Sequence, residues 1–104
     1  MTARRARHTI KATSVVVAAK NQVSSDLAGE AIVHSLQTGR YYGLDPVGAH
    51  IWGLLGTPTP VADIRDCIVR RFDVEPDRCE RDVLTFVQGL ADHELIEISD
   101  ATAP

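Results

Sequence analysis

The segment from Gly39 to Leu55 has the sequence GRYYGLDPVGAHIWGLL, and it contains the change from strand to helix. Its first part, Arg40–Leu44, holds two adjacent tyrosines and is expected to form a strand. Asp45 favours a helix N-cap, and Pro46 suits the first helical position because that position needs no N–H donor. The apolar residues that follow have helical spacing: Val47, Ile51, Leu54 and Leu55.

Two further strands are predicted before this segment. Ser14–Ala19 contains three consecutive valines, and Glu30–Leu36 alternates between two faces. Residues 37–39 form a short turn, so Glu30–Leu36 and Arg40–Leu44 are expected to pair as antiparallel neighbours. The segment Asn21–Gly29 is polar and is predicted to be a turn-rich connection. A sheet of three strands is expected to leave at least one edge with unpaired main-chain groups.

Two further helices are predicted after the first. One begins at Thr59-Pro60 and carries apolar residues as far as Phe72, and the next begins at Pro76 and extends to Leu90. Leu95–Ile98 is expected to form a short last strand. Strands and helices segregated in this way indicate an α+β fold. With a hairpin beside three helices, we expect a winged helix-turn-helix, in which a three-stranded antiparallel N-terminal sheet packs on a three-helix bundle.

Length and charge indicate one small domain. The chain has 104 residues and a net charge of −3. Residues 1–13 contain Arg4, Arg5 and Arg7 and are predicted to form a flexible basic arm, residues 14–98 the domain, and residues 99–104 a tail. No apolar run approaches the roughly 20 residues needed to cross a bilayer, and no hydrophobic segment follows the basic start. We therefore expect a cytoplasmic protein that does not associate with membranes.

Residues typical of catalysis and of cofactor binding do not form a known pattern. The motifs of serine hydrolases, zinc proteases and nucleotide-binding loops are missing, and the histidines lie on different segments. Cys67 and Cys79 lack the spacing of a zinc site, and both are expected to be buried free thiols. The sequence therefore predicts a non-enzymatic protein with no catalytic residue, metal or cofactor.

A regulator that binds DNA or another protein is the main alternative, because winged helices often contact DNA. The third predicted helix tests this idea. Between Glu75 and Glu94 it carries six acidic residues against only Arg78 and Arg81. Such a surface is unsuited to a phosphate backbone, so we expect no nucleic-acid partner.

Residues 39–55 also resemble the core of the PqqD-like family, which has the pattern yy-L-N-x-x-G-x-x-I-W-x-L-L. Asp45 stands where many relatives have Asn, and both residues cap helices. Further resemblance lies in Thr59–Ile64 and in the apolar residues from Val83 to Ile96, so it covers roughly residues 14–98. The family consists of recognition elements for ribosomally made, post-translationally modified peptides.

The resemblance implies a function and a site. The chain is most similar to the stand-alone leader-binding proteins of lasso-peptide pathways, although relatives in pyrroloquinoline-quinone pathways share the motif. By this resemblance, its partners are a precursor leader peptide, a leader peptidase of the cysteine protease class and an ATP-dependent lasso macrolactam synthetase. The leader is expected to pair antiparallel with the strand Arg40–Leu44 and to rest against the third helix. The predicted peptide-binding residues are Val33, Arg40, Tyr41, Tyr42, Gly43, Leu44, Glu75, Asp82, Val83 and Phe86.

Overall fold

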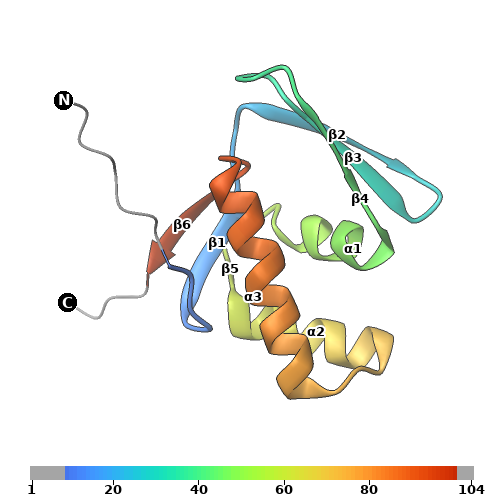
Figure 1. Ribbon diagram of the computed structural model, residues 1–104, viewed down its shortest axis with the longest axis vertical. Coiled ribbons are helices and arrows are strands. Elements are labelled where there is room, and N and C mark those ends of the chain that lie inside the picture. The colour runs from blue at the N-terminus through green and yellow to red at the C-terminus, as the bar shows by residue number, and fades with distance from the viewer. Residues whose placement is uncertain (1–8, 101–104) are drawn as a thin grey trace.

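The structure is a computed structural model that describes residues 9–100, and these residues form two three-stranded sheets and three helices (Figure 1). The elements follow one another along the chain as β1 (Ser14–Ala18), β2 (Gln22–Leu27), β3 (Glu30–Ser35), β4 (Tyr41–Leu44), α1 (Pro46–Leu54), β5 (Thr59–Pro60), α2 (Val61–Phe72), α3 (Pro76–Asp92) and β6 (Ile96–Asp100).

The first sheet has the antiparallel order β2-β3-β4. The predicted pairing of the last two strands is confirmed, with Val33 opposite Tyr42 and Ala31 opposite Leu44. Gly39 has a φ of 78°, a value that glycine adopts without strain, so it allows the short turn between the two strands. The sheet therefore ends in β4 on one side and in β2 on the other.

Strand β2 corrects the prediction that residues 21–29 form a turn-rich connection. This segment pairs with β3 along its whole length and is joined to it by a two-residue turn at Ala28 and Gly29. Both turn residues have positive φ, 53° and 85°. The sequence pattern failed here because an edge strand with polar residues on both faces lacks alternation of apolar and polar residues. The turn also lacks the Asn-Gly or Asp-Gly pair that marks such hairpins.

The valine-rich strand β1 does not join the hairpin. It is the centre of a second sheet with the order β5-β1-β6, in which Val16 pairs with both Thr59 and Ile98. The expectation that Ser14–Ala19 belongs to the N-terminal sheet is therefore wrong. A mixed fold with a three-stranded antiparallel sheet and three helices is confirmed, whereas the winged helix-turn-helix interpretation stays a prediction.

The helix starts follow local side-chain chemistry. Asp45 Oδ1 accepts a hydrogen bond from the Gly48 N–H at 2.7 Å, which confirms the predicted cap of α1. The start of α2 differs from the prediction. Pro60 is its N-cap rather than its first residue and makes no side-chain cap bond. The Thr59 hydroxyl instead donates to the Leu54 carbonyl at 3.0 Å, which ties the end of α1 to β5.

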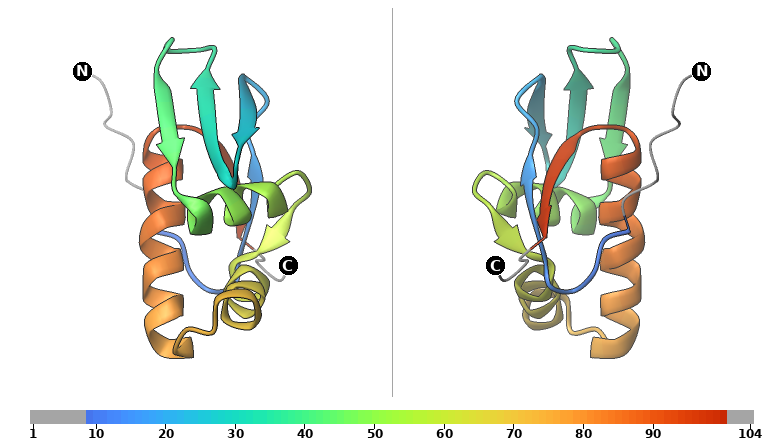
Figure 2. Two further views of the ribbon diagram at one scale, coloured as in Figure 1. Left: turned by 90° about the vertical axis from the view of Figure 1, so that its right-hand side faces the viewer. Right: turned by 90° about the vertical axis from the view of Figure 1, so that its left-hand side faces the viewer.

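The core lies where the two sheets meet the helices (Figure 2). Cys79 is buried as predicted, but Cys67 is only partly buried on α2, so that expectation is wrong for Cys67. Most of the predicted basic arm, residues 1–8, lies outside the described residues. Ile10, near its end, is buried in the core, and its N–H donates to Gln88 Oε1 at 3.1 Å. Within residues 9–100, no helix combines the length and hydrophobicity needed to cross a bilayer.

Candidate functional site

Strand β4 has one edge that is not used by the sheet. The Ser35 N–H donates to the Arg40 carbonyl, so Arg40 faces β3, and main-chain direction alternates along an antiparallel strand. Tyr42 and Leu44 therefore bond to β3, whereas the N–H and C=O groups of Tyr41 and Gly43 point the other way. In the part of the chain that the structure describes, no other segment bonds to these groups. This edge runs beside α3 (Figure 2).

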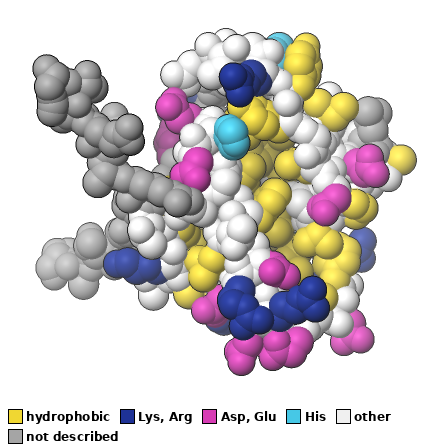
Figure 3. Space-filling model, in the orientation of Figure 1, with side chains coloured by type: hydrophobic (Ala, Val, Ile, Leu, Met, Phe, Trp, Pro, Cys, Tyr) yellow, Lys and Arg dark blue, Asp and Glu magenta, His cyan; other side chains and the backbone are white. Residues whose placement is uncertain are grey.

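A groove starts at Asp45, the residue that follows β4, and lies between α1, α2 and α3. Its cavity has a volume of about 560 Å³ and a mainly apolar lining. Figure 3 shows the same feature as a band of hydrophobic side chains down the middle of this face. Val83 and Ile51 lie at the buried base, and Phe86 forms a wall, together with Val47 and Val74 at the opening. Large apolar side chains of a bound chain would fit here.

Gly48 brings the two walls of the groove close together. A Cβ atom at this position would lie 3.1 Å from two atoms of the Phe86 ring and 3.2 Å from Asp45 Oδ1. Such contacts are tighter than ordinary packing, so a side chain here would displace the ring or the cap. Glycine therefore sets the distance between the start of α1 and α3, and with it the position of Phe86.

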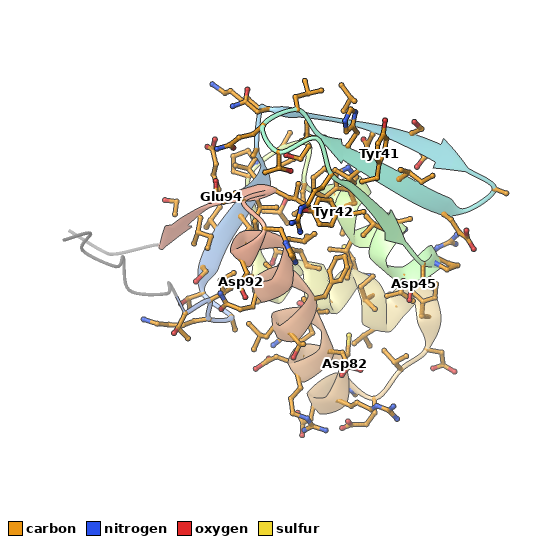
Figure 4. All side chains as sticks on the ribbon, turned by 45° about the horizontal axis from the view of Figure 1, so that its top comes forward. Tyr41, Tyr42, Asp45, Asp82, Asp92 and Glu94 are labelled. Carbon is orange, nitrogen blue, oxygen red and sulfur yellow. The ribbon has the colours of Figure 1, made fainter. Side chains whose placement is uncertain are left out.

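The charged residues of the groove lining are mainly acidic. Asp45 and Asp82 belong to the lining, and Asp82 Oδ2 lies 3.8 Å from Nε of Arg78, which is its basic member (Figure 4). Glu75 also lines the cavity, but its carboxylate accepts a hydrogen bond from the Arg78 N–H at 2.7 Å and caps α3. This arrangement favours a bound chain with basic residues.

The two tyrosines of β4 lie on opposite faces of the sheet. Tyr42 is half-buried and faces α3, where its ring lies 5.0 Å from the ring of His93 (Figure 4). Tyr41 is 67% exposed on the outer face and stacks on His34 at 4.2 Å. Tyr42, rather than Tyr41, therefore lies on the face of β4 that is turned toward α3.

Of the other predicted site residues, some line the groove and some do not. Glu75, Asp82, Val83 and Phe86 are brought together in one cavity. Val33 is completely buried under the sheet, so it supports β4 from the core and is not an exposed wall. Leu44 is likewise buried. Arg40 is exposed at the start of β4, and its N–H donates to Thr38 Oγ1. Gly43 lies on the free edge, and a Cβ built on it would meet no atom within 4 Å.

The groove has one thiol beneath it. Burial raises the pKa of the Cys79 thiol, which lies under the groove, so this thiol stays protonated near neutral pH. Within residues 9–100, no three side chains of His, Cys, Asp or Glu are placed to hold a metal ion together. The arrangement is suited to holding an extended polypeptide by main-chain pairing and apolar contact.

Comparison with known proteins identifies the family. Residues 30–96 match the model of the family described as coenzyme PQQ synthesis protein D, PqqD. The chain belongs to the PqqD family. The matched residues of this PqqD-family chain extend from β3 to the start of β6, so they include β4, the groove and α3.

Two solved structures resemble this PqqD-family chain. One is TbiB1 in complex with the TbiA(beta) leader peptide, with 36% identity, a TM-score of 0.72 and coverage of 85% of this chain and 99% of that one. The other is the NMR structure of the PqqD truncation of Methylobacterium extorquens PqqCD, described as a functional, stand-alone recognition element. It has 18% identity, a TM-score of 0.71 and coverage of 85% and 94%, and this likeness shows the fold. Among curated protein sequences, none matches.

Sequence reasoning missed several residues that line the groove. Asp45 and Val47 lie at its mouth, although the sequence predicts only the start of a helix there. Val74, which no sequence pattern points to, is 39% exposed in the loop between α2 and α3. An apolar residue in a short predicted loop between two helices is the one signal in the sequence, because such a residue is expected to be exposed and exposed apolar residues often mark binding surfaces.

Proposed function

We propose that this chain is a non-catalytic adaptor that binds the leader segment of a ribosomally made precursor peptide as a strand added to β4. The observation that carries the proposal is the free edge at Tyr41 and Gly43 beside an apolar groove. The structure of TbiB1 with a leader peptide supports it, because TbiB1 and this chain are similar over most of both chains.

The proposed leader runs antiparallel to β4. In this direction its N-terminal part lies over the groove beyond Leu44, and its C-terminal part leaves near Arg40 and the turn at residues 37–39. Apolar leader side chains enter the groove between Val83 and Phe86. Basic leader residues lie near Asp45 and Asp82.

Main-chain pairing alone does not give useful affinity. Tyr41 and Gly43 each offer one N–H and one C=O, which makes four groups on β4. At about 1 kcal/mol net each, four bonds contribute about 4 kcal/mol. Association costs about 4–15 kcal/mol, so apolar anchors at about 2 kcal/mol each must supply the rest. The groove side chains therefore decide both affinity and the choice of leader.

The adaptor then presents the leader to its maturation enzymes. We propose a leader peptidase of the cysteine protease class and an ATP-dependent lasso macrolactam synthetase as these partners, acting in the cytoplasm. The alternative of a regulator that binds DNA finds no support. Helix α3 borders an apolar groove whose charged residues are mainly acidic, and such a surface disfavours a phosphate backbone.

Titration of a fluorescently labelled synthetic leader into the purified chain tests the proposal. The leader is taken from a precursor frame encoded beside this chain. We expect saturable binding in the micromolar range or tighter, and weak binding of a scrambled leader with the same composition. Equal anisotropy curves for the two peptides would refute the proposal.

A further inference from the structure

Most of the exposed large apolar side chains among residues 9–100 belong to the β2-β3-β4 sheet and its turns rather than to the groove. They are Val23, Ile32, Leu36 and Tyr41, with exposed fractions from 39% to 67%. Val23, Ile32 and Tyr41 lie on the outer face of the sheet, opposite to the face that covers the core (Figure 4). A sheet face in contact with water normally carries polar side chains, so this face is suited to a further contact.

Cross-strand pairing arranges this outer face in rows that run from β2 to β4. Two of these rows are Val23–His34–Tyr41 and Ser25–Ile32–Gly43. Each row ends at the free edge of β4, so a strand added there supplies the next side chain of both rows. The second row has no side chain at its last position, and a Cβ atom built on Gly43 would meet nothing within 4 Å. An open space, the Gly43 notch, therefore lies over Gly43 and is bordered by Ile32 and Tyr41.

The Tyr41 ring gives the notch a fixed border. It stacks on the His34 ring, with the centroids 4.2 Å apart and an angle of 6° between the ring planes. Tyr41 and His34 are opposite each other without hydrogen bonds between their main chains, and side chains approach most closely in such pairs. The stack keeps the ring in its own row, so the ring lies beside the notch and does not fill it.

We propose that the leader residue opposite Gly43 carries a large apolar side chain, which fills the Gly43 notch and packs against Ile32. This inference rests on the proposed function. On a leader strand paired with β4, the residues opposite Gly43 and Tyr41 point to the outer face, and the residue opposite Tyr42 points toward α3. A large side chain, an aromatic ring above all, can lie across a glycine of the neighbouring strand and cover it.

The position and size of the outer face favour a leader side chain over a second copy of this chain. The notch lies at the margin of the face, about 5 Å from a strand added to β4. Ile32 lies one strand further away, so a long or aromatic side chain reaches it whereas a short one does not. Three strands of about six residues cover roughly 300 Å² of sheet, far less than the roughly 800 Å² per partner of a stable dimer. The leader is therefore selected on both faces of β4.

Gly43→Val tests the notch by filling it. The variant keeps the N–H donor of residue 43, has room for its side chain and introduces a residue that favours strands, so we expect the sheet to stay intact. The matched control is Ser25→Val, which adds the same side chain to the same row on β2, away from the leader. The probe is the labelled synthetic leader from the precursor frame encoded beside this chain, titrated by anisotropy, with thermal melting as the fold control.

We expect Gly43→Val to weaken leader binding roughly tenfold, because the notch is no longer open, and Ser25→Val to bind as the wild-type chain does. Both variants are expected to melt no lower than the wild type. The inference is overturned if folded Gly43→Val binds the leader as tightly as the wild type does, or if Ser25→Val loses as much affinity. A wild-type dimer in sedimentation that Gly43→Val dissociates overturns it as well, because the face then belongs to a second copy.

A substitution in the leader shows whether one side chain occupies the notch. Nuclear Overhauser contacts across the added strand identify the leader residue opposite Gly43, which is expected to be aromatic or branched aliphatic. Its replacement by alanine should weaken binding to the wild-type chain roughly tenfold and binding to Gly43→Val less than about twofold, since the notch is already filled there. Equal losses in the two chains, or a small or charged residue at this leader position, overturn the inference.

Ile32→Ala gives an independent result if Gly43→Val does not fold. It removes the far side of the notch and leaves the main chain of β4 unchanged. Leader binding should weaken at least about threefold, and unchanged binding by a folded Ile32→Ala variant overturns the inference. Failure of the leader to bind the wild-type chain refutes the proposed function itself, whereas a leader that binds without these effects refutes only the notch.

Discussion

Replacement of Gly43 by proline is the most direct test of strand addition on β4. The Gly43 N–H points to the free edge, so its loss removes no bond to β3. A Cβ atom at this position meets nothing within 4 Å, so the chain itself has room for a larger residue. Gly43→Pro therefore removes a hydrogen bond to the bound leader and leaves the hydrogen bonds between β4 and β3 in place.

The expected loss follows from the bonds at this edge. The substitution removes one of the four main-chain bonds offered by Tyr41 and Gly43, at about 1 kcal/mol. It also leaves a leader carbonyl without a donor in a partly buried place, at about 1–3 kcal/mol. The sum is about 2–4 kcal/mol. This loss corresponds to weaker binding, with a dissociation constant roughly 30- to 1,000-fold higher.

The assay is anisotropy of the labelled leader, with circular dichroism and thermal melting as fold controls. Gly43→Ala is the matched control, because it adds a side chain but keeps the donor, and its affinity should stay within a few-fold of wild type. The reasoning is refuted if Gly43→Pro folds normally and binds the leader as tightly as Gly43→Ala does.

Three further outcomes are expected. Tyr42→Ala should weaken leader binding several-fold more than Tyr41→Ala, because only the first ring faces α3; the reverse order in anisotropy titrations would contradict this assignment. Ala28→Asn should stabilise the chain by about 0.5–1 kcal/mol in urea unfolding, because Asn tolerates the positive φ of 53° better than Ala does; an unchanged midpoint would argue against strain at this turn. Burial raises the pKa of Cys79 above its ordinary value of 9.0. The contribution of the protonated thiol to the free energy of unfolding is therefore fully present below that pH, and it is lost as the pH rises through the folded-state pKa. A Cys79→Ala variant should show a smaller fall in unfolding free energy between pH 8 and 11, and equal falls would exclude this origin.

The parts of the fold that could be predicted depend on local chemistry. The hairpin of β3 and β4, the Asp45 cap and the start of α3 each follow from a few neighbouring residues. The place of β1 could not be predicted, because its partners are β5 and β6, which lie far away in the sequence. Strand β2 could not be predicted, because its inner side chains, Gln22, Ser24 and Asp26, line an open cavity at the surface rather than the core.

The sequence predicts the relative positions of some candidate site residues and not of others. Helical spacing placed Asp82, Val83 and Phe86 on one helix, and the cavity confirms that they lie together. Periodicity could not decide which tyrosine faces α3, since adjacent residues of a strand always lie on opposite faces and either phase was consistent with the sequence. The pairing of Val33 with Tyr42 settles the phase, and this pairing is a property of the folded sheet.

The turn at residues 37–39 consequently limits how this family can diversify. One residue gained or lost there would shift β4 by one position and exchange its two faces, so that Tyr42 and the buried Leu44 would turn toward solvent. Changes of side chain in the groove have no such effect on the pairing. New peptide preferences should therefore arise by point substitution on α1 and α3, while the length of this hairpin is inherited unchanged.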